Sequence, residues 1–138
     1  MYTVIGFDLT RPYLPGLSTF QWLIDNTINN NPEVDVTAPD AGVTLCKLAA
    51  QATDCPTMKK LCEAIVNHEM KLFIGDEGRD GTLMAIECVT FGGNDFNKHG
   101  LERAIECIDE WAEWFKTHFP ETDLHRHLTL FPVFTNWE

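Results

Sequence analysis

Hydrophobic and polar residues alternate at the start of the chain, where Ile5, Phe7 and Leu9 share one side of the extended segment 2–9. A period of two places every second side chain on the same face of a β-strand. Further strand-like segments occur at residues 71–74 and 82–91, which flank a glycine-rich turn. A last one covers residues 124–134. The pattern therefore predicts four strands.

Helical spacing, with apolar residues at i, i+3 and i+4, appears in four segments. It predicts helices over residues 18–29, 41–51, 56–68 and 98–118, with Asp40 and Asp54 as N-caps of the second and third. The last helix is the longest. Its inward positions are expected to be Leu101, Ala104, Ile105, Ile108, Trp111, Ala112, Phe115 and Phe119.

The predicted order is a strand, three helices, two strands, a helix and a strand. This order indicates an α+β fold with a four-stranded antiparallel sheet and helices packed on one face, the split βαβ or ferredoxin-like arrangement. Its first crossover is unusually long because it holds three helices. No repeat and no linker interrupts the sequence, so a single domain over residues 1–138 is expected. Such folds host many unrelated functions.

The cysteines and the apolar segments indicate where the protein works. An odd number of cysteines with no C-x-x-C pair argues against a disulfide framework and a zinc knuckle. These residues are Cys46, Cys55, Cys62, Cys88 and Cys107. Cys46, Cys62 and Cys88 are predicted to be buried reduced thiols. Without a signal-peptide pattern or a run of about 18 apolar residues, we expect a cytoplasmic protein with no membrane contact and no cofactor.

The formal net charge of −11 is the largest anomaly of the composition. Residues 76–123 hold twelve acids and four bases, whereas the other 90 residues hold nine acids and six bases. The negative field is therefore concentrated in the C-terminal half. Nucleic acids and anionic membranes require a basic surface, so direct binding to either is not expected.

The long helix carries a row of acids opposite its apolar face. Its members are Glu102, Glu106, Asp109, Glu110 and Glu113, with Trp114 adjoining. Like charges at i and i+4 each cost a few tenths of a kcal/mol, so the row is locally unfavourable. Two interpretations follow: a solvated face that keeps an acidic protein dissolved, or a docking surface for a basic partner, with Trp114 as an aromatic contact.

The docking interpretation predicts a non-enzymatic acidic protein that inhibits or neutralises a basic partner, including a nucleic-acid-binding one. Small immunity proteins and phage counter-defence factors that mimic nucleic acid belong to this class by analogy. No P-loop, G-x-G-x-x-G, H-E-x-x-H or G-x-S-x-G motif is found, and no catalytic residue is assigned.

An alternative function rests on the last predicted strand, where alternation would place His125, His127 and Thr129 on one face. Two histidines at i and i+2 of a strand can ligate a metal ion if a third ligand joins them. The segment 127–130, His-Leu-Thr-Leu, also resembles one half of the signature of two-histidine phosphoesterases. The second H-x-[ST] element of that signature is missing. This alternative is a small metal-binding protein or a hydrolase.

A third alternative is a homo-oligomer formed through an open sheet face. In this arrangement Thr129, Phe131 and Val133 would supply the contact between copies. Alternatively, the histidine row on this face would be exposed to solvent and have a purely structural role.

Overall fold

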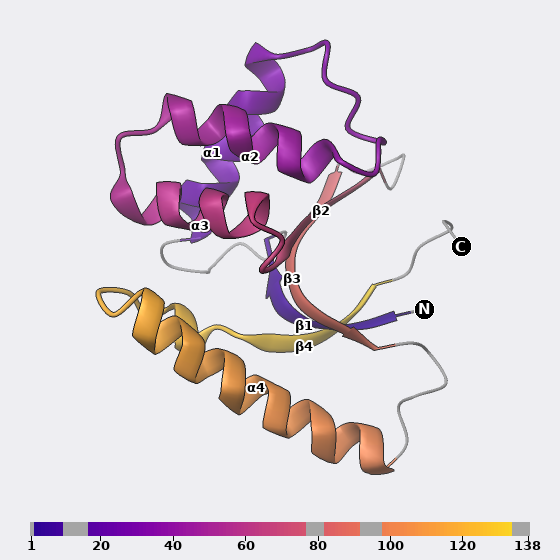
Figure 1. Ribbon diagram of the computed structural model, residues 1–138. Coiled ribbons are helices and arrows are strands. Elements are labelled where there is room, and N and C mark those ends of the chain that lie inside the picture. The colour runs from indigo at the N-terminus through magenta and orange to yellow at the C-terminus, as the bar shows by residue number, and fades with distance from the viewer. Residues whose placement is uncertain (1, 10–16, 77–81, 92–97, 134–138) are drawn as a thin grey trace. The chain divides into compact units, whose positions relative to one another are not determined.

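The computed structural model describes residues 2–9, 17–76, 82–91 and 98–133 (Figure 1). Its strands are β1 (Tyr2–Asp8), β2 (Lys71–Asp76), β3 (Thr82–Phe91) and β4 (Thr129–Val133). They form one antiparallel sheet in the order β2-β3-β1-β4. The predicted α+β class and four-stranded antiparallel sheet are confirmed. The ferredoxin-like placement of the helices stays a prediction.

The described helices are α1 (Leu17–Asn30), α2 (Ala41–Ala52), α3 (Pro56–Val66) and α4 (Lys98–His118), followed by the short 3-10 helix η1 (Leu124–Arg126). The first three lie between β1 and β2, as the long crossover predicts. Internal packing divides the chain into two compact units, Leu9–Ile86 and the pair of segments Met1–Asp8 and Glu87–Glu138. The boundary falls within β3. The single-domain expectation stays a prediction.

In the unit that contains both termini, α4 packs against β1. The rings of Phe7 and Phe115 meet edge to face, with centroids 5.2 Å apart. Ile5, Phe91 and Ala104 form a buried cluster, against which other apolar side chains pack, namely Val89, Cys107, Ile108, Leu128 and Leu130. β1 also pairs with β4, so that Ile5 lies opposite Leu130. The apolar stripe of α4 is therefore held against the sheet.

The other unit is a cluster of helices on β2. α2 contacts α1, α3 and β2. Its core includes buried side chains of each helix, among them Phe20, Ile24, Leu45, Cys46, Ala49, Leu61, Cys62 and Ile65. Among the described residues, Thr27 is the one polar residue with a buried side chain, and its hydroxyl donates to the Leu23 carbonyl at 2.8 Å. The buried hydroxyl therefore has a hydrogen-bond partner, as buried polar groups usually do.

Three predicted helix and strand limits are wrong for local reasons. α3 ends at Val66 rather than at residue 68, because His68 adopts the left-handed conformation with φ 62°. Its N-cap is Cys55 instead of Asp54, with Pro56 opening the helix. β4 begins at Thr129 rather than at residue 124, because residues 124–126 form η1.

α2 approaches β2 closely at Gly42. A Cβ atom at this position would collide with the backbone carbonyl of Leu72 and press on its side chain. Backbone atoms cannot yield as the end of a flexible side chain can. Glycine at this position therefore sets the distance between the helix and the strand.

Gly42→Ala is expected to destabilise the chain by about 1–3 kcal/mol, because overpacking outweighs the gain in helix propensity. Urea unfolding followed by circular dichroism measures the change. Gln51→Ala, at an exposed position of the same helix, is the control and should be close to neutral. A Gly42→Ala chain as stable as the native one would contradict the close approach.

Candidate functional site

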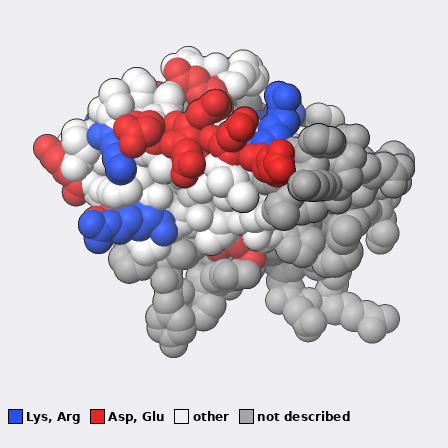
Figure 2. Space-filling view, turned by 90° about the horizontal axis from the view of Figure 1, so that it is seen from below, with Lys and Arg blue, Asp and Glu red and all other residues white. Residues whose placement is uncertain are grey.

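The outward face of α4 is acidic, as the sequence predicts. Glu102, Glu106, Asp109, Glu110 and Glu113 are all exposed. Ala104 and Phe115, on the opposite side of the helix, are buried. Seen from below, the molecule shows a row of acidic side chains with basic side chains near its ends (Figure 2). We call the five carboxylates the acidic row.

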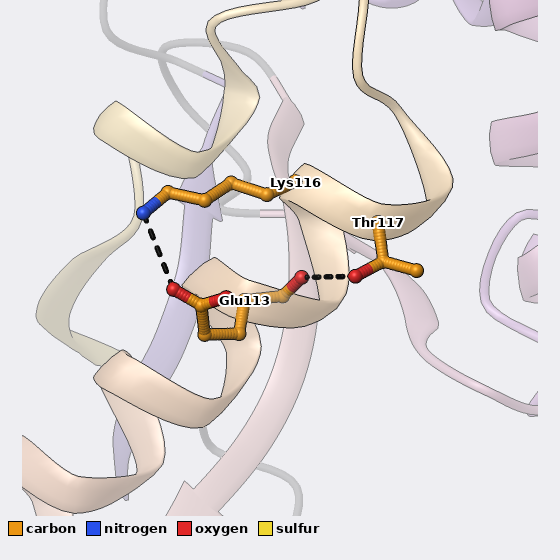
Figure 3. A network of polar contacts seen from close by, with 3 residues as sticks. All are labelled: Glu113, Lys116 and Thr117. Atoms are coloured by element: carbon orange, nitrogen blue, oxygen red, sulfur yellow. Dashed lines mark hydrogen bonds and ion pairs between the residues drawn. The ribbon is translucent and has the colours of Figure 1, made fainter.

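The acidic row is poorly neutralised. Within the described part of the chain, Glu113 is the one member with an ion pair, to the Lys116 ammonium at 3.2 Å (Figure 3). Both side chains of that pair are more than half exposed, so water screens it and it adds little stability. The Thr117 hydroxyl donates to the Glu113 carbonyl at 3.0 Å, which involves no charge. Three pairs at i, i+4 therefore repel one another: Glu102–Glu106, Glu106–Glu110 and Asp109–Glu113.

The predicted inward position of Ile105 in the apolar stripe of α4 is wrong. The sequence pattern places it inward, yet it is 55% exposed. Successive helical residues point about 100° apart, so a stripe centred on Ala104 and Phe115 turns Ile105 towards its edge. There it neighbours Glu102 at i−3 and Asp109 at i+4. A large apolar side chain is thus exposed beside the acidic row.

Trp114 adjoins the other edge of the acidic row, one turn after Glu110. It is only partly exposed and belongs to an aromatic cluster at the C-terminal end of α4. Its ring centroid lies 4.9 Å from that of Phe115 and 4.4 Å from that of His118. Trp111 and Phe119 complete the cluster. These contacts cover part of the indole, so only part of its surface is open to a partner.

The placement of the histidines on a strand is wrong. His125 lies within η1 and His127 follows as its C-terminal cap. The Arg126 N–H donates to the Asp123 carbonyl and the His127 N–H to the Leu124 carbonyl, which are the i, i+3 bonds of a 3-10 turn. With about three residues per turn, positions two apart point about 120° away from each other. His125 and His127 therefore do not form a row with Thr129.

The metal alternative lacks a third ligand where the structure can be described. Among these residues, no three His, Cys, Asp or Glu side chains gather as a metal site would require. The Nδ1 atom of His125 is buried, and none of the described residues hydrogen-bonds to it. The homo-oligomer alternative requires an exposed sheet face at Phe131, but this residue is only 4% exposed. The side chain of Val133 lies outside the described residues.

Comparisons with known proteins assign no relative. The chain matches no protein-family model, no curated protein and no solved structure. Of the helices in the described segments, none combines the length and the apolar character needed to cross a bilayer. The site must therefore be judged on its own chemistry.

Glu106→Lys should stabilise the isolated chain by about 1 kcal/mol at low salt, because two repulsive i, i+4 pairs become attractive. The free energy of unfolding in urea measures the gain. At about 1 M salt, where the screening length is about 3 Å, most of it should disappear. Glu33→Lys, an equal charge change at an exposed position that is not part of α4, is the control. If both substitutions changed the free energy of unfolding equally, repulsion within the acidic row would not be the cause of the gain.

His125→Phe should raise stability by about 1 kcal/mol, since it removes a buried nitrogen for which the described residues provide no hydrogen bond, while keeping an aromatic ring. His127→Phe is the control. The Tm of thermal unfolding, with and without added Zn²⁺, measures the change in stability. A Zn²⁺-dependent rise in Tm that His125→Phe abolishes would contradict this prediction and support the metal alternative.

Proposed function

We propose that this chain is a non-enzymatic acidic protein that binds a basic partner through the acidic row of α4 and thereby neutralises the partner's surface. The observation that carries the proposal is the row itself. Five exposed carboxylates lie on one helix face, and only Glu113 has an ion pair in the described part of the chain. A cationic surface would supply the missing counter-charges.

The spacing of the row supports a partner that binds nucleic acid. Residues 102–113 span about 17 Å of helix axis, so five carboxylates give one charge per about 3–4 Å. One strand of DNA carries a phosphate per about 3.4 Å of its axis. The row therefore approaches the linear charge density of a single phosphate backbone. A protein surface that binds such a backbone would find a similar field on α4.

The edges of the row support a protein partner over simple ions. Ile105 is exposed on one side and Trp114 is partly exposed on the other. Protein interfaces combine apolar contacts with charged groups, and tryptophan is enriched among the residues that dominate binding energy. An apolar contact over Ile105 would add affinity that salt does not screen.

Affinity capture with matched charge variants tests the proposal. The immobilised native chain should retain a basic protein from a host extract at low salt and release it at high salt. Glu106→Lys with Glu110→Lys should abolish capture. Glu33→Lys with Glu69→Lys changes the net charge from −11 to −7 in the same way, but off the row, and should retain capture.

Competition identifies the surface of the partner that is involved. Added DNA should release the captured protein, because both ligands would occupy the same basic surface. Unchanged capture by the Glu106→Lys, Glu110→Lys chain would refute the proposed site. Capture that DNA does not disturb would remove the nucleic-acid-binding class of partner.

A further inference from the structure

The outward face of α1 exposes a tryptophan. Phe20, Leu23 and Ile24 are buried in the core of the helical unit, Leu9–Ile86. At about 100° per residue, Trp22 points to the side of the helix opposite these three, and it is 66% exposed. Ile105 of α4 is the other large apolar side chain that is exposed among the described residues. Trp22 has no part in the acidic row, so its exposure needs an account of its own.

The neighbours of Trp22 on the helix surface are polar, and one of them is charged. Residues three or four positions apart lie on the same side of a helix, with Cβ atoms about 5–6 Å apart. By this spacing, Thr19 precedes Trp22 by one turn, and Asp25 and Asn26 follow it. Asp25 is exposed as well. A group that stacks on the indole of Trp22 is therefore within reach of a carboxylate.

The carboxylate of Asp25 lacks a counter-charge in the described part of the chain, where no hydrogen bond or ion pair of this group is found. Neighbouring atoms also remove part of its water, which raises the pKa of Asp25. A cation in contact with Asp25 would replace the lost hydration and favour the ionised form.

The sequence around α1 supplies no cation. Between Arg11 and Lys47 it contains no lysine or arginine. The same stretch holds four acids, all of them exposed: Asp25, Glu33, Asp35 and Asp40. The charge on this part of the chain is therefore uniformly negative, which favours a cationic ligand over an anionic one.

We propose that Trp22 and Asp25 bind an arginine side chain of a protein partner. The planar guanidinium stacks on the indole of Trp22 and donates hydrogen bonds to the Asp25 carboxylate. Arginine suits this pair better than lysine, because its flat, weakly hydrated group can stack and donate at once, whereas an ammonium is a compact and strongly hydrated charge. The contact goes beyond the proposed function, since it lies on α1 and does not depend on the acidic row.

An NMR titration of the full chain with tetra-arginine tests this contact, with tetra-lysine as the matched peptide of equal charge. Loss of one signal in Trp22→Phe assigns the indole N–H of Trp22. At low salt this signal should shift saturably with tetra-arginine, and half-saturation by tetra-lysine should need a concentration about 2- to 5-fold higher. Equal responses to the two peptides, or no shift, would overturn the proposal.

Matched variants separate the contact from the general negative charge. Asp25→Asn should raise the Kd read from the Trp22 signal about 2- to 5-fold. Glu33→Gln removes the same charge from the same base-free stretch and should leave this Kd nearly unchanged. Equal weakening by both variants would refute a specific role of Asp25. In the Glu106→Lys, Glu110→Lys chain the Trp22 shift should persist, whether or not the acidic row binds a partner, and its loss there would contradict an independent contact.

Discussion

The packing of α4 against β1 determines which way every side chain of the helix points. Phe115 meets Phe7 edge to face, and Ala104 belongs to a buried cluster with Ile5. Each step along a helix turns by about 100°, so these contacts fix the rotation of α4. The acidic row faces outward as a geometric consequence. The core does not, however, dictate that the outward residues be acidic.

The acidity of the row therefore needs a reason other than folding. Interspersed lysines would satisfy the same geometry and would replace repulsion with attraction. The Glu113–Lys116 contact shows that the helix can form such pairs, yet no ion pair of Glu106 or Glu110 is found within the described segments. A basic partner would convert this unfavourable arrangement of the free chain into a favourable one in the complex. Ile105 adds an apolar contact at the edge of the same surface.

Local patterns predicted most of the fold, because period-two and period-3.6 spacing depend on few residues. The sheet, the order of elements and the span of α4 follow from them. The 3-10 turn at η1 was missed because hydrogen bonds from Arg126 and His127 override an alternating pattern of only a few residues. Ile105 was misplaced because the width of a buried stripe depends on the surface it meets.

The most direct measurement is carbodiimide labelling of carboxylates, read by mass spectrometry, on the free chain and on its complex with the captured partner. Exposed acids should react equally in the free chain. In the complex, Glu106 and Glu110 should be protected, while Glu33 and Glu69 keep their reactivity. Equal labelling of Glu106 and Glu110 with and without the partner would contradict the claim that a positively charged surface covers α4.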